Sequence, residues 1–166
     1  MILPVQIGSA MRLVFLFLLT SCSIFFGSDT PKSAKGSEYK VGFDQSRWEA
    51  KKDERSDYVF ENKEDGRILL SNSFCEEFQE DPLDQLAMKT FRTINKFQAQ
   101  KKEYTTFNNR EAYRVSGTGE VDGVKVNLKL LNTRRNNCYF DFLSIDPLSA
   151  TKDDAFEKFL GSVEFQ

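Results

Sequence analysis

The clearest pattern in the chain is an alternation of apolar and polar residues over positions 124–132. Successive side chains of a strand point to opposite faces of a sheet, so this alternation predicts a strand with one buried face and one wet face. The Asp122-Gly123 pair before it favours a hairpin turn, and a partner strand is expected on its other side. The apolar positions are Val124, Val126, Leu128 and Leu130, and the polar ones are Lys125, Asn127 and Lys129.

Shorter runs of the same kind recur along the chain and are separated by turn residues. Turn-forming pairs or clusters stand at positions 63–66, 108–109 and 136–137. Closely spaced strands joined by tight turns favour an antiparallel sheet. The further strands expected cover residues 46–51, 57–62, 67–74, 102–107, 111–118, 138–145 and 162–165.

Two segments have helical spacing instead. One runs from Asp81, the expected N-cap, and Pro82, the expected first helical residue, to Phe97. The other is short, with Thr151 as the expected cap and Gly161 as its end. The expected fold class is therefore α+β, a central antiparallel sheet with helices packed on it. The apolar stripe of the longer helix is Leu83, Leu86, Ala87, Thr90, Phe91, Ile94 and Phe97.

The first 22 residues differ from the rest in having one charge, Arg12, followed by an apolar run over residues 13–19. A run of this length is typical of the hydrophobic region of a signal peptide and is shorter than the ~20 residues of a membrane-spanning helix. Leu19-Thr20-Ser21-Cys22 resembles the bacterial lipoprotein signal, in which the cysteine is acylated and becomes the new N-terminus. The alternative is an uncleaved apolar anchor that ends in a cysteine. Translation from Met1 or from Met11 preserves the motif.

The chain is thus divided into three parts. Residues 1–21 are expected to be a lipoprotein signal peptide, residues 22–42 an acylated N-terminus with a flexible tether, and residues 43–166 the folded domain. Ser23 after the acylated Cys22, by resemblance to enterobacterial lipoproteins, favours the outer membrane. The expected location is the cell envelope, with the domain facing the periplasm.

The amino-acid composition excludes several kinds of catalytic and binding site. The 166 residues contain no histidine, which excludes a Ser-His-Asp triad, a Cys-His pair and a His-ligated zinc ion. A net charge of −2 argues against nucleic acid as a partner. No pair of catalytic groups stands at a telling spacing, so we expect no enzyme, no cofactor and no metal site.

Cys75 and Cys138 remain once Cys22 is assigned to lipid, and each stands at the end of an expected strand. An even number of cysteines in an exported protein favours a disulfide. Two separate buried thiols are the main alternative, and a reactive or metal-binding cysteine is a third.

Arg134 and Arg135, together with Lys125 and Lys129, form a candidate basic edge for docking a partner. The same residues are also compatible with a solvated hairpin tip.

The order of the elements carries a resemblance to a known family. A strand ending in SNSF, an amphipathic helix, the meander NNREAYRVSGTGEVDGVKVNL, the strand NNCYFDF and the ending FEKFLGSVEF resemble the PsbP/Mog superfamily over residues 43–166. The resemblance implies an α/β/α sandwich that serves as a non-catalytic accessory or docking module. Without histidine, no His-containing metal site of that family can be transferred to this chain.

Taken together, these features predict a lipid-anchored envelope accessory protein that binds another envelope component, of unknown identity, without catalysis. The alternative is a binder of a small hydrophobic molecule in a pocket between sheet and helix. The residues expected to line such a pocket are Phe91, Phe107 and Tyr113.

Overall fold

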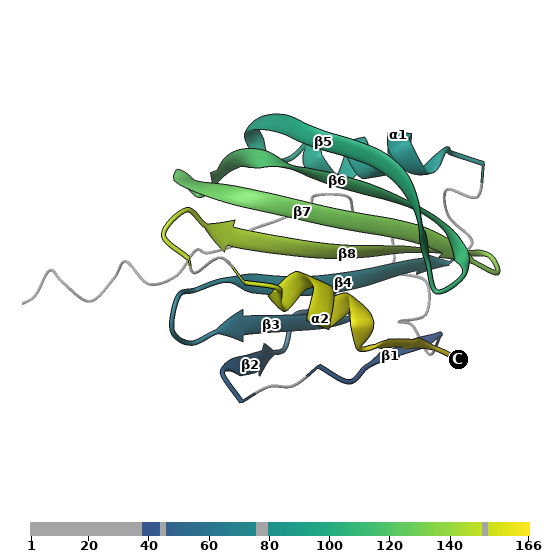
Figure 1. Ribbon diagram of the computed structural model, residues 1–166, viewed down its shortest axis with the longest axis horizontal. Helices are drawn as coiled ribbons and strands as arrows, with labels where there is room; N and C mark the ends of the chain where they lie inside the picture. Colours follow the sequence, from purple (N-terminus) through teal and green to yellow (C-terminus); the bar gives the residue numbers. More distant parts are fainter. Residues whose placement is uncertain (1–37, 44–45, 76–79, 151–152) are drawn as a thin grey trace, which may run out of the picture.

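The fold is built on a seven-stranded antiparallel sheet with the strand order β2-β3-β4-β8-β7-β6-β5 (Figure 1). The computed structural model describes residues 38–43, 46–75, 80–150 and 153–166. A separate two-stranded sheet pairs β1 with β9. The strands are β1 Tyr39–Val41, β2 Trp48–Lys51, β3 Tyr58–Asn62, β4 Ile68–Cys75, β5 Asn95–Phe107, β6 Arg110–Val121, β7 Val124–Arg135, β8 Cys138–Pro147 and β9 Val163–Phe165, and the helices are α1 Leu83–Phe91 and α2 Ala155–Gly161.

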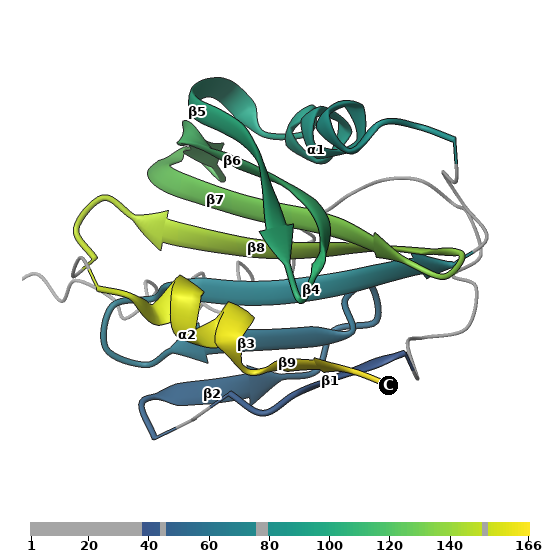
Figure 2. The same ribbon diagram turned by 45° about the vertical axis from the view of Figure 1, so that its right-hand side comes forward.

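The two helices lie on opposite faces of the large sheet, which we call the α1 face and the α2 face (Figure 2). The alternation along β7 is confirmed, because Val126, Leu128 and Leu130 enter the core beneath α1. Phe140 and Phe142 of β8 point the other way, into the core formed with α2, β1 and β9. Each face therefore has its own apolar core.

The hairpin turns follow the predicted residues. Asn108 and Asn109 between β5 and β6 have φ of 47° and 59°, and Asp122 and Gly123 between β6 and β7 have φ of 50° and 78°. Two-residue turns with positive φ at both central positions match the twist of the flanking strands. Asn, Asp and Gly tolerate that conformation better than other residues, which explains why these pairs marked the turns correctly.

Helix α1 is shorter than predicted. It begins at Leu83 after Pro82, without a side-chain cap, and the carboxylate of Asp81 accepts a hydrogen bond from Lys89 at 2.6 Å instead of capping the helix. The helix ends at Phe91 and β5 begins at Asn95, so Ile94 and Phe97 lie outside it. Both still pack into the α1-face core, which is why the apolar spacing continued past the end of the helix.

Helix α2 begins after Asp154, and the carboxylate of Asp153 accepts a hydrogen bond from the backbone N–H of Ala155 at 2.9 Å. The predicted cap, Thr151, lies outside the described residues. Phe156, Phe159 and Leu160 of this helix are buried, as their spacing predicted.

The folded unit begins earlier than the predicted boundary at residue 43. Strand β1, which falls in the segment expected to be a tether, pairs antiparallel with β9 near the end of the chain. Tyr39 is buried, and its hydroxyl lies 2.7 Å from the Ser71 hydroxyl and donates to Asp57 at 3.1 Å. Burial and the nearby Asp57 raise the pKa of this hydroxyl. A lone three-residue strand carries little local signal, so the tertiary packing of Tyr39 decides this boundary.

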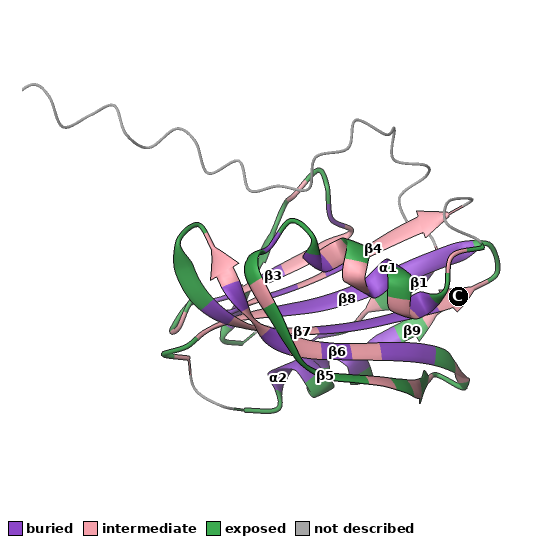
Figure 3. Ribbon diagram, turned by 90° about the horizontal axis from the view of Figure 1, so that it is seen from above, coloured by how far each residue is buried: buried purple, intermediate pink, exposed green. Residues whose placement is uncertain are grey.

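The fold is broadly α+β, as predicted, but the sheet dominates it more than a helix-packed sandwich would imply. The two helices are short and each covers only part of its face (Figures 1 and 2). Figure 3 shows the consequence: β8 is mostly buried, whereas the edge strand β5 is exposed over most of its length. No helix in the described part of the chain is both long and apolar enough to cross a membrane.

Candidate functional site: a polar trough beside α2

The predicted disulfide is present. Cys75 at the end of β4 and Cys138 at the start of β8 are direct cross-strand partners, with their Cα atoms 4.0 Å apart, and their sulfurs are bonded. The bridge spans 63 positions of sequence. By the chain-entropy model a loop of this size contributes about 4 kcal/mol to stability. Cys22, the predicted lipidation site, lies outside the described residues.

The structure does not bring the four residues of the predicted basic edge together. They lie on β7, an interior strand between β6 and β8, with Lys125 near one end and Arg134 and Arg135 at the other. Arg134 donates a hydrogen bond to the backbone carbonyl of Asp81, ahead of α1. Arg135 donates to the Glu38 carbonyl at 3.3 Å and lies 5.5 Å from the Phe165 ring. Both arginines therefore bind backbone carbonyls of other segments of the chain, one ahead of α1 and one ahead of β1.

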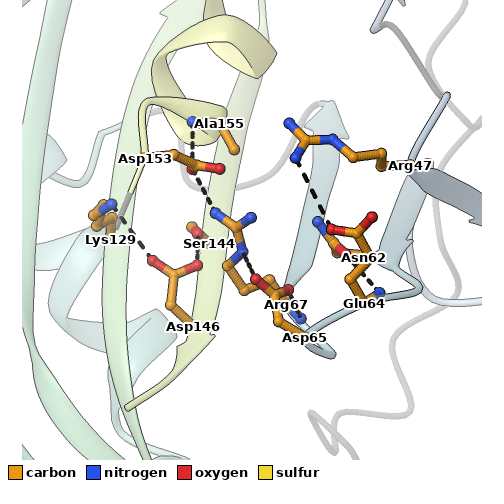
Figure 4. A network of polar contacts seen from close by, with 10 residues as sticks. All are labelled: Arg47, Asn62, Glu64, Asp65, Arg67, Lys129, Ser144, Asp146, Asp153 and Ala155. Carbon is orange, nitrogen blue, oxygen red and sulfur yellow. Dashed lines mark hydrogen bonds and ion pairs between the residues drawn. The ribbon is translucent and has the colours of Figure 1, made fainter. Parts of the chain in front are cut away.

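A polar network centred on Arg67 fastens α2 to the turn between β3 and β4 (Figure 4). Arg67 is only 4% exposed, with Nε 2.8 Å from an oxygen of Asp65 and an NH group donating to Asp153. Its guanidinium also lies 5.4 Å from the Trp48 ring centre. The bond to Asp153 raises the pKa of Arg67, and the same bond lowers the pKa of Asp153. Both groups therefore stay charged, and the segment before α2 is held by an ion pair whose arginine is buried and whose carboxylate is partly exposed.

Beside this network the α2 face carries two adjoining hollows of about 200 and 320 Å³, which we call the trough. They adjoin because Ser116 and Lys129 line both of them. The trough is walled by residues of α2 and of the segment before it, including Phe156, Glu157 and Asp153. Its floor comes from β5, β6 and β7, on the part of the face that the short helix leaves uncovered.

The floor of the trough is a row of residues in cross-strand register. Lys101 of β5 pairs with Ser116 of β6, Ser116 pairs with Lys129 of β7, and Lys129 pairs with Ser144 of β8. Directly paired side chains on one face are near neighbours, so short serines alternate here with long lysines. The hollow exists because serine is too short to fill the space between the two lysines.

Charges in the trough are matched in pairs. Lys101 lies 2.7 Å from Glu103, Arg114 donates to Glu157 at 2.8 Å, and Lys129 lies 3.4 Å from Asp146. Figure 4 shows Lys129 directed at Asp146, which also accepts a hydrogen bond of 2.6 Å from Ser144. The arrangement offers cations, carboxylates and hydroxyls for recognition. Among the described residues no group of three or more His, Cys, Asp or Glu side chains could hold a metal ion.

Only part of this site is evident from the sequence. Lys129 was identified for its wet face, but Lys101, Arg114 and Ser116 were not identified, because their proximity depends on the registers of three strands. The local signals are the charged run Lys101-Lys102-Glu103 in β5 and the alternating polar positions of β6.

The α1 face contains a different polar cluster, which is buried. Asp141 of β8 is 5% exposed and accepts a hydrogen bond from Thr90 of α1 at 2.9 Å. Its cross-strand partner Asn132 donates to the Leu83 carbonyl at 2.8 Å and to the Tyr139 hydroxyl at 3.0 Å. Burial raises the pKa of Asp141 to about 7. This cluster joins α1 to the sheet.

The residues of the predicted hydrophobic pocket do not share one face. Phe91 and Tyr113 belong to the α1-face core, where Phe91 stacks on Phe97 with ring centres 4.0 Å apart. Phe107 packs against the opposite core, 5.5 Å from the ring of Phe142. The three rings therefore fill two separate cores and do not line a common pocket.

Several solved structures have a fold similar to that of this chain. The chain is similar to cyanobacterial PsbP (CyanoP) from Synechocystis sp. PCC 6803, with a TM-score of 0.58 and 11% identity over 89% of this chain and 99% of that chain. It is also similar to LpqN of Mycobacterium tuberculosis, described as involved in cell envelope biogenesis, with a TM-score of 0.54 and 11% identity over 76% of this chain and 82% of that chain. The fold is thus PsbP-like, in agreement with the resemblance seen in the sequence.

A crystal structure from Bacteroides thetaiotaomicron VPI-5482 has a TM-score of 0.56 and 14% identity, and the match covers 77% of this chain. It spans 45% of the length of the Bacteroides chain. No family model and no curated protein matches the chain.

Proposed function

We propose that this protein is a lipid-anchored accessory protein of the cell envelope, held through Cys22 on the outer membrane and facing the periplasm, which acts by binding another envelope component. The observation that carries the proposal is a PsbP-like fold, similar to that of LpqN, which is described as involved in cell envelope biogenesis, in a chain whose first residues resemble a lipoprotein signal. Acylation of Cys22 with two or more chains gives stable anchoring without a basic patch. The domain is then free to present one face to a partner.

Within this proposal the trough is the binding surface. It is concave, it lies next to the well-fastened helix α2, and its rim and floor supply charged groups and hydroxyls from five elements. Groups held on strands of a rigid sheet keep their positions when a ligand binds. Paired cations and carboxylates favour recognition of a polar partner, so the proposed role is binding and not catalysis.

The proposal is tested by chemical cross-linking in intact cells, comparing the acylated protein with a Cys22→Ser variant and a trough variant carrying Lys101→Glu and Lys129→Glu. We expect a discrete cross-linked species for the wild type and its loss in the trough variant. The matched control is Lys125→Glu, on the same strand and face as Lys129 but outside the trough. Its cross-linked species should persist.

The anchoring part has its own readout. Labelled fatty acid should be incorporated into the wild type and not into Cys22→Ser, which should leave the membrane fraction. A wild-type protein that carries no label, or a cross-link that survives in the trough variant, would contradict the corresponding half of the proposal.

A further inference from the structure

We infer that the trough binds a phosphate group, carried by the envelope component or free, over Ser116 and between Lys101, Lys129 and Arg114. This inference rests on the proposed function, since it names the chemistry recognised at the same surface. It follows from the positions of three cations around one short hydroxyl side chain.

The geometry is set by the sheet. Lys101 and Lys129 flank Ser116 on the two neighbouring strands, each about 5 Å away in the hydrogen-bonding direction. Arg114 is two residues before Ser116 on β6, and so stands on the same face about 7 Å along the strand. All four residues line the smaller hollow, whose far wall is Phe156 of α2. Three cationic residues thus surround Ser116 at the level of the backbone, and their long side chains can turn toward a tetrahedral oxyanion placed there, which has several acceptor oxygens.

The donors around this space are not fully used. No hydrogen bond to another described residue occupies the Ser116 hydroxyl. The Nε of Arg114 is buried and has no hydrogen-bond partner among the described residues. Each lysine ammonium has three N–H donors, and within the described part of the chain Lys129 has one carboxylate contact, at 3.4 Å. The Ser116 hydroxyl and the lysine ammonium groups therefore have hydrogen-bonding capacity for an incoming group, whereas the Arg114 Nε has no surface that such a group could reach.

The carboxylates that pair with two of these cations are exchangeable. The side chains of Glu103 and Glu157 are 39% and 55% exposed, so their ion pairs with Lys101 and Arg114 are weak surface interactions, worth about 0.2–1 kcal/mol each. A phosphate group can displace them, and both carboxylates can turn into water. Asp146 differs, because it is 15% exposed and is held by Ser144. It stays beside Lys129 and limits the affinity, so we expect a modest affinity that depends on salt.

The test is calorimetric and NMR titration of the purified full chain in detergent micelles at constant ionic strength. The probes are inorganic phosphate, glucose 6-phosphate with glucose as its uncharged counterpart, and phosphatidylcholine vesicles with and without phosphatidic acid. We expect saturable binding of phosphate and glucose 6-phosphate, none of glucose, and shifts of the amide signals around Ser116. Binding confined to the vesicles with phosphatidic acid identifies a lipid headgroup as the source and also supports the inference.

Three variants test whether phosphate binds at the trough. Lys129→Ala should weaken phosphate binding about tenfold, the loss expected when one charge-assisted hydrogen bond is removed. Lys125→Ala, four residues away on the same face, should change it less than about twofold. Glu103→Gln should strengthen binding about two- to fivefold, because a competing carboxylate is removed. The Glu103→Gln variant is expected to gain affinity for phosphate, and a damaged fold cannot produce such a gain.

The inference is overturned if no phosphate-bearing probe binds, if glucose binds as well as glucose 6-phosphate, or if Lys125→Ala weakens binding as much as Lys129→Ala. A cross-link that depends on Lys101 and Lys129 in a protein that binds no phosphate-bearing probe would overturn it while leaving the proposed function intact. Phosphate binding without any trough-dependent cross-link in cells would instead contradict the proposed function.

Discussion

The two faces of the sheet use the same strands for different purposes. On the α1 face, β6, β7 and β8 contribute apolar side chains, and the carboxyl of Asp141 is buried among them with hydrogen-bond partners. On the α2 face the same strands supply a core near α2 and then a trough of serines, lysines and carboxylates. Polar groups on the α1 face connect α1 to the sheet, whereas those of the trough remain in contact with water. The difference is the basis for our proposal that the α1 face serves stability and that the uncovered part of the α2 face serves binding.

The largest expected effect is a difference in the free energy of unfolding between substitutions at two adjacent residues of β7. Leu130 is fully buried on the α1 face, so Leu130→Ala should lower the free energy of unfolding by about 2–5 kcal/mol. Lys129 points into the trough, and Lys129→Ala should lower it by less than about 1 kcal/mol. Urea denaturation followed by circular dichroism measures both. Equal losses would remove the basis for assigning different roles to the faces.

The next effect concerns the ion pair that holds the wall of the trough. Arg67→Ala removes the buried partner shared by the partly exposed carboxylates of Asp153 and Asp65 and should cost about 1.5–3 kcal/mol. Arg47→Ala is the matched control, because its 3.9 Å contact with Glu64 joins two exposed side chains and is worth less than about 1 kcal/mol. The same denaturation experiment compares them. If Arg67→Ala unfolds no more easily than Arg47→Ala, the network does not fasten α2.

A pH-dependent effect tests the buried carboxyl on the α1 face. Burial raises the pKa of Asp141 from 3.8 to about 7, so the native state binds a proton that the unfolded state releases. The resulting stability is fully present below about pH 4 and is lost as the pH rises toward 7, by at most ~1.4 kcal/mol per pH unit. Asp141→Asn should remove this part of the pH dependence. A wild type and an Asp141→Asn variant with parallel stability curves between pH 4 and 7 would contradict the assignment.

The sequence predicted the strands and turns better than it predicted which residues of different strands lie next to one another. Three features follow from local spacing or from counting, and the structure contains them: the alternation along β7, the turns at Asn108-Asn109 and Asp122-Gly123, and the Cys75–Cys138 bridge. The end of α1 was missed because Ile94 and Phe97 face the same core as the helix does.

The trough was missed for another reason. Its defining row depends on which residues of β5, β6 and β7 stand opposite one another, and a shift of one position would send Ser116 to the other face. Nothing local distinguishes Lys101 in the trough from Lys102 on the opposite face. Similarly, Asp141 lies in an otherwise aromatic strand, and only the packing of α1 shows that its carboxyl is buried with a partner.

The neighbouring residues Lys101 and Lys102 also provide the most direct test that the trough is the binding surface. A photo-cross-linking amino acid is placed at position 101, in the trough, or at position 102, on the opposite face, in the acylated protein in intact cells. We predict a discrete adduct from position 101 and none from position 102. An adduct of equal yield from both positions, or from position 102 alone, would contradict the account.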